Sequence, residues 1–342
     1  MQIKQEKKND TTLIHVKTDC GMEVVFSTFG ASFYDLKTFD KNKKLESIVL
    51  TPTKYEDFCF SDGYYGKSVG RYSGRIDNSV CTINGVEYKL DRNWNGVNAL
   101  HGGFEGISFQ NFDYEINEEE EYADIVFTFL EKENQLPGDV FYTITYRVMN
   151  KESDINITFE ATTTKDTIVN LTNHIYFNLS GNGVRNCLDH KIQFLCDKYT
   201  KLNNNLITET IEKVNDVMDF RDMHKLGKYI YDESLQNHKA KGYDHCFIKE
   251  DLNNPKVAVL VDEESGRRVS VESSYPAIVC YAGCYPGSFG FNKEGFKIGQ
   301  YHSVCLECQY IPNGINMDGV CKAILKKGEK YSHYIKYHFD LV

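Results

Sequence analysis

Apolar and polar residues alternate with a period of two in several long segments of this 342-residue chain. Clear examples are GMEVVFSTF (21–29), YADIVFTFL (122–130), VFYTITYRV (140–148) and DINITFEAT (154–162). Successive side chains of a strand point to opposite faces, so this period predicts strands with one face in a core. The 23 Tyr and 21 Phe add to the strand preference, and no long stretch has the helical period. We therefore expect an all-β chain with few short helices, one of them near residues 219–226.

Turn signals separate the alternating segments. Asn84-Gly85 suits the two positive-φ positions of a type I′ turn, which predicts a hairpin between residues 81–83 and 86–90. The acidic run at 118–121 lies between two predicted strands and is expected to be a solvated loop. No linker or internal repeat interrupts the pattern. Residues 1–342 are therefore expected to form a single domain, a large antiparallel β-sandwich of packed sheets.

Charge and composition exclude several classes of partner. A formal net charge of −10 argues against a general nucleic-acid or anionic-membrane surface. No run approaches the roughly 20 apolar residues of a membrane span, and the charged start MQIKQEKKND does not resemble a signal peptide. The 11 Cys show no disulfide framework, which is typical of reduced, buried thiols. We expect a cytoplasmic protein that binds neither nucleic acid nor membrane.

Two segments carry polar residues that a simple strand does not need. NLTNHIYFNLSG (170–181) reads as a strand with a mostly apolar face and a second face of Thr172, His174, Tyr176 and Asn178. That second face either meets water or lines a wet pocket. In SVCLECQYI (303–311), Glu307 and Gln309 share a face, although a single Glu on a strand most often meets solvent. Cys305 and Cys308 point to opposite faces of that strand, which argues against a metal or redox pair.

Three Gly-rich or aromatic segments resemble loops at the rim of a site: GRYSGRIDN (70–78), NALHGG (98–103) and KGYDHCF (241–247). Glycines beside Arg71, Arg75 and His101 allow the backbone to approach a bound molecule. Each segment is a weak signal alone. His245 and His302 are interpreted as packing or surface residues. No phosphate-binding loop of the G-x-x-x-x-G-K-[ST] type is present.

The order of these segments resembles that of the aldose 1-epimerases, also called galactose mutarotases. The matching segments are GRYSGRI, NALHGG, NLTNHIYFNLSG, MDFRD, GYDHCF and CLECQYIPNGIN, and the resemblance runs from about residue 21 to the C-terminus. It implies a large twisted β-sandwich with an open cleft. It also implies an isomerase that interconverts the α and β anomers of free hexoses such as D-galactose and D-glucose by opening and closing the ring.

The resemblance also assigns roles to individual residues. Glu307 would be the catalytic base and His174 the catalytic acid, whereas Arg75, His101 and Asp244 would bind sugar hydroxyls. An aromatic residue near the sugar ring is expected, and Tyr176 is the candidate. The reaction needs neither a metal nor another cofactor. The partner is a small sugar, and the protein is expected to be a monomer or a weak homodimer.

The chain departs from the family pattern at four places. Gly74 stands where many members have Asn, and Leu136 where a Tyr is common. Val279 stands where some members have Gln, and no Trp follows LHGG. None of these changes affects the acid or the base, but all of them leave the preferred sugar open.

Three other functions remain open from the sequence. The first is a glycoside hydrolase with Asp244 and Glu307 as its carboxylate pair. The second is a sugar-binding protein without catalysis, against which the presence of both Glu307 and His174 argues. The third is an epimerase of hexose 6-phosphates, which calls for further basic residues in the cleft. Only Arg71 and Lys67 are candidates for that role.

Overall fold

The computed structural model describes residues 1–60, 63–285 and 290–342. Strands predominate in these ranges, and the two α-helices found there are short: α1 (Tyr55–Phe60) and α2 (Glu233–Gln236). The all-β prediction is confirmed. Among the described residues, no helix is long and apolar enough to cross a membrane.

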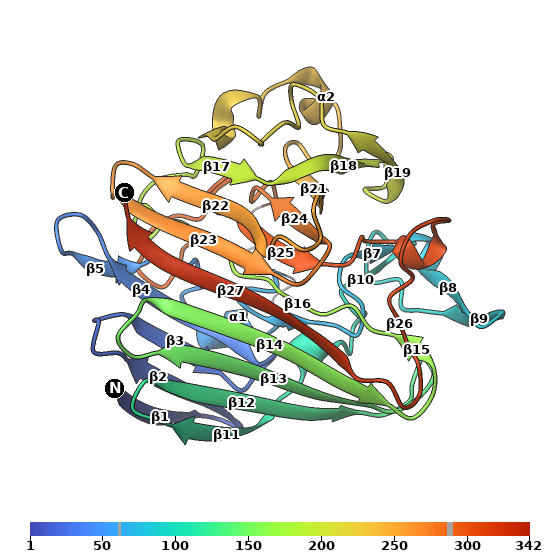
Figure 1. The fold of residues 1–342 in the computed structure, drawn as a ribbon, viewed down its shortest axis with the longest axis horizontal. Coiled ribbons are helices and arrows are strands. Elements are labelled where there is room, and N and C mark those ends of the chain that lie inside the picture. Colours follow the sequence, from blue (N-terminus) through green and yellow to red (C-terminus); the bar gives the residue numbers. More distant parts are fainter. Residues whose placement is uncertain (61–62, 286–289) are drawn as a thin grey trace.

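A nine-stranded antiparallel sheet faces the viewer in Figure 1. Its strands, in spatial order, are β11 (Asp113–Glu118), β12 (Tyr122–Glu131), β13 (Val140–Met149), β14 (Asp154–Thr163), β27 (Tyr331–Leu341), β23 (Arg267–Ser273), β22 (Lys256–Asp262), β17 (Lys191–Phe194) and β20 (His224–Lys225). Three of the four alternating segments became β12, β13 and β14. Phe127, Ile144 and Phe159 lie side by side across them and are fully buried.

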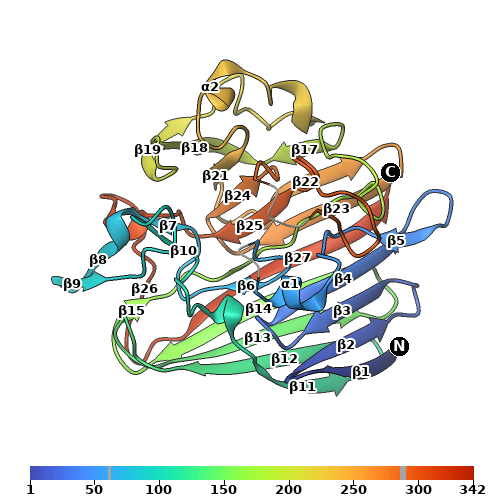
Figure 2. The same cartoon turned by 180° about the vertical axis from the view of Figure 1, so that it is seen from behind.

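Two five-stranded sheets pack against this large sheet. The first comprises β1 (Gln2–Lys8), β2 (Thr11–Lys17), β3 (Glu23–Ser27), β4 (Ser32–Phe39) and β5 (Leu45–Ser47). The second comprises β19 (Thr208–Lys213), β18 (Cys196–Leu202), β21 (Asp244–Lys249), β24 (Ala277–Tyr281) and β25 (Cys305–Gln309). Seen from behind, both are near the viewer, at opposite ends of the large sheet (Figure 2).

Aromatic side chains join the layers. Phe26 of β3 and Phe33 of β4 contact Tyr146 of β13, with ring centroids 4.8 and 5.1 Å apart. At the other end, Phe247 of β21 stacks on Phe194 of β17 at 4.7 Å. Burial of rings of this size is a main source of stability in a β-sandwich.

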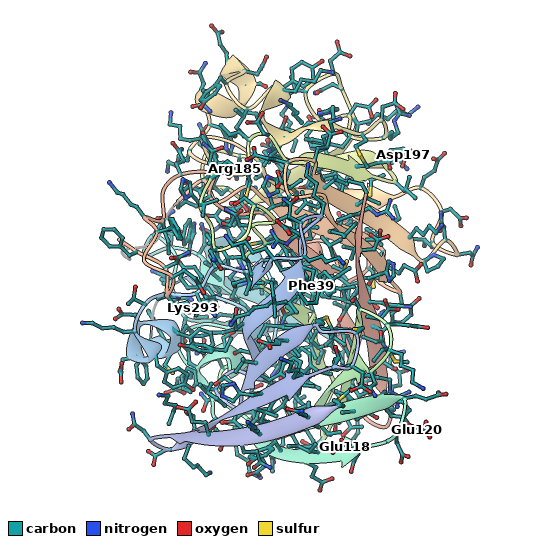
Figure 3. All side chains as sticks on the ribbon, turned by 90° about the vertical axis from the view of Figure 1, so that its left-hand side faces the viewer. Phe39, Glu118, Glu120, Arg185, Asp197 and Lys293 are labelled. Carbon is teal, nitrogen blue, oxygen red and sulfur yellow. The ribbon has the colours of Figure 1, made fainter. Side chains whose placement is uncertain are left out.

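Four two-stranded pieces fill the space around these sheets: β6 (Ser68–Val69) with β16 (Thr172–Asn173), β7 (Arg75–Ile76) with β10 (Ala99–Leu100), β8 (Val80–Ile83) with β9 (Val86–Lys89), and β15 (Thr167–Ile168) with β26 (Ile324–Leu325). The predicted hairpin is β8–β9, and φ is +50° at Asn84 and +80° at Gly85. The acidic run is exposed where β11 turns into β12, and Glu118 and Glu120 extend outward in Figure 3.

The helix predicted near residues 219–226 is wrong. The chain there forms the edge strand β20 and then a 3₁₀ turn at Leu226–Lys228. A side-chain oxygen of Asp219 accepts the backbone N–H of Arg221 at 3.0 Å, and a ring nitrogen of His224 lies 2.9 Å from the Asp219 carbonyl oxygen. Local bonds of this kind compete with a helix for the same backbone groups.

The strand predicted over residues 170–181 is largely wrong as well. Only Thr172–Asn173 (β16) pairs regularly, and both sides of the segment are buried. Its polar side chains bond to backbone carbonyls instead of water: Thr172 donates to Cys308 at 2.8 Å, and Asn178 donates to Arg185 at 2.7 Å. The segment threads between sheets, so alternation did not separate core from solvent.

Candidate active site

A cavity of about 290 Å³ lies over the second five-stranded sheet. Its floor follows from the register of β21, β24 and β25, because side chains on paired positions of neighbouring strands share one face. One row runs from Cys246 through Val279 to Glu307, and the next places Asp244 beside Tyr281. All five side chains line the cavity.

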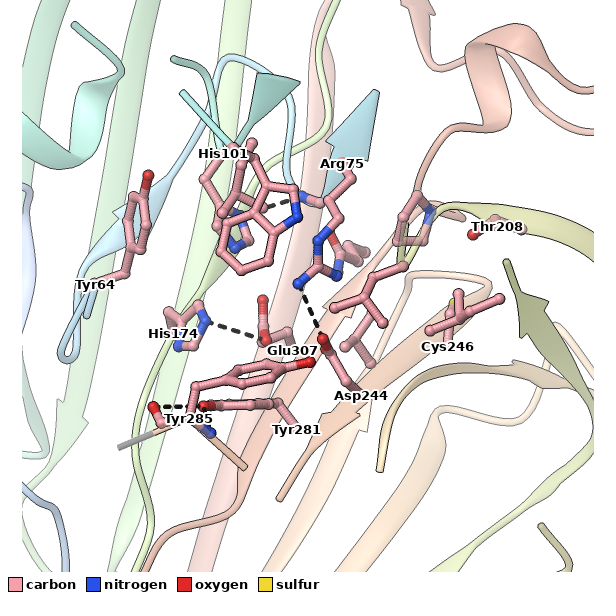
Figure 4. Close-up of a pocket in the computed structure, with 18 of the residues that line it drawn as sticks. Tyr64, Arg75, His101, His174, Thr208, Asp244, Cys246, Tyr281, Tyr285 and Glu307 are labelled. Carbon is pink, nitrogen blue, oxygen red and sulfur yellow. Dashed lines mark hydrogen bonds and ion pairs between the residues drawn. The ribbon is translucent and has the colours of Figure 1, made fainter. Parts of the chain in front are cut away.

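His174 and Glu307 meet inside this cavity (Figure 4). His174 Nε2 lies 3.4 Å from Glu307 Oε1, and their side chains are 7% and 3% exposed. His174 Nδ1 and Glu307 Oε2 are buried without a hydrogen-bond partner. Unpaired buried polar atoms are costly, so these two atoms are candidates for hydrogen bonds to a bound ligand.

Burial shifts both groups toward their neutral forms. It raises the pKa of Glu307 well above its usual value, and the nearby Asp244 carboxylate raises it further, whereas Arg75 opposes the shift. Burial lowers the pKa of His174 to about 4. Both shifts favour the state in which a proton shared by the pair stays on Glu307. Transfer of that proton from Glu307 to His174 produces a base and an acid side by side.

His101 approaches the same point from the loop after β10. Its ring lies 5.4 Å from that of His174, nearly perpendicular to it. Its Nδ1 accepts the N–H of Gly74 at 3.2 Å, so the neutral ring carries its proton on Nε2 and can donate it into the cavity. Burial, together with repulsion from His174 and Arg75, holds the pKa of His101 well below its usual value. His101 is therefore a neutral hydrogen-bond donor.

Gly74 has a structural reason to be glycine here. Its φ is +82°, and a Cβ would lie 2.7 Å from Cβ of Pro312. The backbone N–H of Gly74 orients His101, a contact that needs no side chain at this position. Gly in place of the family's Asn at position 74 therefore still allows His101 to be oriented toward the cavity.

His101, His174 and Glu307 form a group whose ligand atoms lie within 4.8 Å of one another. Such a group invites comparison with a two-histidine, one-carboxylate metal site. A metal-bound His normally donates its second ring N–H to an acceptor, whereas His101 accepts a bond at that nitrogen. Its remaining nitrogen then holds a proton in place of the lone pair that a metal needs. The three residues fit a hydrogen-bonding site better than a metal centre.

Arg75 and Asp244 form an ion pair at the next position along the cavity. Arg75 Nη2 lies 3.0 Å from Asp244 Oδ2, and the side chains are 14% and 9% exposed. Arg75 Nε is buried without a partner, and the guanidinium lies 4.6 Å from the ring centre of Trp94. The pair offers fixed donors and acceptors to hydroxyl groups.

Tyr176 lines the cavity beneath the histidine. Its ring stacks on that of His174 at 4.8 Å, and its hydroxyl donates to the Gly63 carbonyl. The hydroxyl is therefore occupied, and the contact fixes the imidazole plane. The structure brings together all six residues that the sequence analysis selected: Arg75, His101, His174, Tyr176, Asp244 and Glu307.

Sequence reasoning missed a second set of lining residues: Trp94, Leu202, Leu206, Thr208, Tyr281 and Tyr285. Trp94 Nε1, Thr208 Oγ1 and Tyr285 Oη are buried without partners, as is Oε1 of Gln309. Trp94 alone had a visible signal, since it is a large aromatic residue in the polar stretch DRNWNGVN. His245 and His302 do not line the cavity.

Arg71 and Lys67, the two candidates for binding a sugar phosphate, do not line the cavity. Arg71 is buried against Glu131, with Nη2 and Oε1 3.1 Å apart. Lys67 is fully buried, donates to the Cys59 carbonyl at 2.7 Å and lies 4.4 Å from the centre of the Phe109 ring. Among the described residues that line the cavity, Arg75 is the single Arg or Lys.

Known proteins resemble this chain in sequence and in fold. The family model described as aldose 1-epimerase matches residues 12–338. The galactose mutarotase of Mus musculus is 31% identical over 326 residues, covering 94% of this chain and 92% of that protein. The aldose 1-epimerase of Escherichia coli (strain K12) is 30% identical over 338 residues, covering 96% and 94%.

Solved structures of related proteins have the same fold. An aldose epimerase homologue from C. elegans superposes with a TM-score of 0.85 at 25% identity, covering 97% of this chain and 99% of that one. A galactose 1-epimerase from Lactobacillus acidophilus shares the fold, with a TM-score of 0.83 at 24% identity over 99% and 98% of the two chains. The chain therefore belongs to the aldose 1-epimerase family, a family of isomerases that interconvert the anomers of sugars.

Proposed function

We propose that the protein catalyses the mutarotation of free aldohexoses, D-galactose and D-glucose among them, with Glu307 as the base and His174 as the acid. Mutarotation opens the ring hemiacetal, turns the aldehyde about C1–C2 and closes the ring on the other face. A base takes the proton of the C1 hydroxyl while an acid protonates the ring oxygen. Closure reverses both transfers, so each group works in both directions.

One observation carries this proposal: a buried carboxylate oxygen and an imidazole nitrogen lie 3.4 Å apart. The C1 hydroxyl and the ring oxygen are bonded to the same carbon, so the two proton transfers occur at neighbouring oxygens. The spacing of Glu307 and His174 suits that demand. General acid–base catalysis of this kind contributes about 10² to 10⁴ in rate per group.

The remaining polar residues suit the task of holding the open-chain sugar. Only the aldehyde carbon must rotate, so the rest of the molecule has to stay bound. Arg75 and Asp244 provide a fixed donor and acceptor pair, and His101 provides a neutral N–H. Tyr176 supports His174 from below. A site that fixes the chain but leaves C1 free favours reclosure over release.

Competing functions fit less well. A hexose 6-phosphate needs cations in the cavity, and Arg75, the basic residue of the described lining, already pairs with Asp244. A glycoside hydrolase would use Asp244 as a free carboxyl group, but Arg75 holds it. A binding protein without catalysis has no need of two proton-transfer groups in contact. The single domain over 1–342 and the monomeric or weakly dimeric state remain predictions.

Polarimetry of freshly dissolved α-D-galactose and α-D-glucose in weak buffer tests the proposal. Catalytic amounts of protein should speed the decay of optical rotation without changing its endpoint. α-D-Glucose 6-phosphate in the same assay separates the phosphorylated alternative. The proposal would be contradicted if the protein accelerated mutarotation of the phosphate ester alone. It would also be contradicted if none of the three sugars were accelerated.

A further inference from the structure

Trp94 lies across the part of the cavity that holds the Arg75–Asp244 ion pair. It is the only Trp of the chain, and its ring covers the Arg75 guanidinium at 4.6 Å. Its edge meets the ring of Tyr285, with centroids 6.4 Å apart at an interplanar angle of 62°. The indole is half-buried, but its Nε1 is fully enclosed and lacks a hydrogen-bond partner. One face of the indole therefore belongs to the cavity.

Residues from other segments of the chain meet Trp94 there. Leu202, Leu206 and Ala240 form an apolar cluster against which Trp94 and Tyr285 pack. Leu202 and Leu206 also line the cavity. Together, Trp94, Leu202, Leu206 and Tyr285 form a roof over this end of the cavity, built from segments far apart in the sequence.

The segment that carries Trp94 is anchored. The turn that follows it has φ of +52° at Asn95 and +67° at Gly96, the combination of a tight type I′ turn. Asn93 clamps the segment, since its side chain both donates to and accepts from the Leu100 backbone at 2.8 Å. Leu100 precedes His101, so the roof and the catalytic side of the cavity are fixed to each other.

The geometry of a pyranose relates the roof to the catalytic pair. On the proposed function, C1 lies at Glu307 and the ring oxygen at His174. The ring atoms opposite these two are C4 and C3. O3 and O4 therefore point away from the catalytic pair, toward Arg75 and Asp244 and beneath Trp94. A second sugar ring attached to O4 would have to occupy the space of the indole.

We propose that Trp94 is a specificity-determining residue: the roof admits a monosaccharide and excludes a sugar that carries a second ring on O4. The cavity of about 290 Å³ is at the small end of ligand sites, which agrees with one sugar ring.

The experiment compares D-glucose with maltose, which is glucose with a glucosyl group on O4. Mutarotation kcat/KM is measured for the wild type, Trp94→Ala and Trp94→Phe. The wild type should prefer glucose by about 10²-fold, which is the range that a shape-selective pocket achieves. Trp94→Ala should reduce that preference to about tenfold or less, and Trp94→Phe should keep most of it.

Two further variants guard against trivial explanations. Leu206→Ala widens the roof from the opposite segment and should also reduce the preference, even if Trp94→Ala folds poorly. Phe291→Ala removes an aromatic ring that is 55% exposed and does not line the cavity, so it should leave the preference unchanged.

The outcomes separate this proposal from the function on which it rests. Equal kcat/KM for glucose and maltose in the wild type overturns the roof and leaves the epimerase standing. If the wild type turns over neither glucose nor maltose, the proposed function is overturned. Trp94 fluorescence then tests whether the roof still excludes maltose from binding. A fluorescence change on titration with glucose but not with maltose supports it. The same change with both sugars overturns it.

Discussion

Replacing Glu307 by Gln should make the folded protein more stable while removing its base. The Glu307 side chain is 3% exposed, and its Oε2 has no hydrogen-bond partner. Gln has nearly the same shape and no charge. Burial and the Asp244 carboxylate raise the pKa of Glu307, so ionisation of this group costs free energy in the folded state only.

The sign of the pH dependence follows from that shift. Below the unfolded pKa of a Glu, about 4.3, the carboxyl is protonated in both states and costs nothing. As the pH rises through the higher folded pKa, the wild type loses stability and Glu307→Gln does not. The variant should gain about 1 to 3 kcal/mol in the free energy of unfolding at pH 8, because a buried carboxyl oxygen without a partner costs more when it is charged than the neutral amide does. The gain should shrink toward pH 4.5.

Urea unfolding of both proteins at pH 4.5, 6 and 8 measures this difference. Glu120→Gln is the matched control, because the Glu120 side chain is 90% exposed and its neutralisation should change little at any pH. A Glu307→Gln variant that is less stable than the wild type at pH 8 would refute the reasoning. A gain of equal size at all three pH values would refute it as well.

Three further predictions concern the proton-transfer pair, the Arg75–Asp244 ion pair and the buried Lys67. The kcat/KM of mutarotation should have a bell-shaped pH profile, because His174–Glu307 is inactive when it holds two protons or none; the acid limb should lie near pH 4, where His174 protonates, and a profile without that limb would contradict the shared-proton pair. Arg75→Lys, which loses the stack on Trp94 and the fixed fork toward Asp244, should raise KM for galactose about tenfold with a smaller change in kcat; a loss confined to kcat would show that Arg75 does not act in binding. Lys67→Met should stabilise the fold by about 1 to 4 kcal/mol at pH 6, judging from replacements of buried charges. Burial lowers the Lys67 pKa to about 7, so the wild type loses stability as the pH falls from about 10 toward 7; denaturant unfolding at pH 6 and 10 should show the gain shrinking at the higher pH, and a constant gain would contradict the assignment.

The regular part of the fold was readable from the sequence. β12, β13 and β14 alternate over ten residues each, and their buried positions follow that period. Asn84-Gly85 fixed the β8–β9 hairpin through backbone conformation alone. These features are local, since each depends on residues a few positions apart.

The segment that carries His174 was harder to predict, for a physical reason. Residues 170–181 alternate like a strand, yet both sides are buried and the polar side chains bond to backbone carbonyls of distant segments. Those partners are set by tertiary packing. The resemblance to a family nevertheless selected His174 and Glu307 as the candidate acid and base, and both line the cavity, whereas periodicity had left them open between water and a pocket.

The roof of the cavity was not predictable. Trp94, Leu206 and Tyr285 come from three separated segments, and no spacing relates them. Their meeting depends on how the turn after Trp94 and the chain between β18 and β19 fold over the second five-stranded sheet. All three residues lie outside the segments that carry the resemblance to the family.

The turnover of α-D-galactose by Glu307→Gln and His174→Asn, followed by polarimetry beside the wild type, tests the central claim most directly. Unchanged circular dichroism would show that each variant keeps the fold. Both variants should lose at least about 10²-fold in kcat, with smaller changes in KM, because each lacks one of the two proton-transfer groups. Wild-type turnover in either variant would contradict the assignment of base and acid.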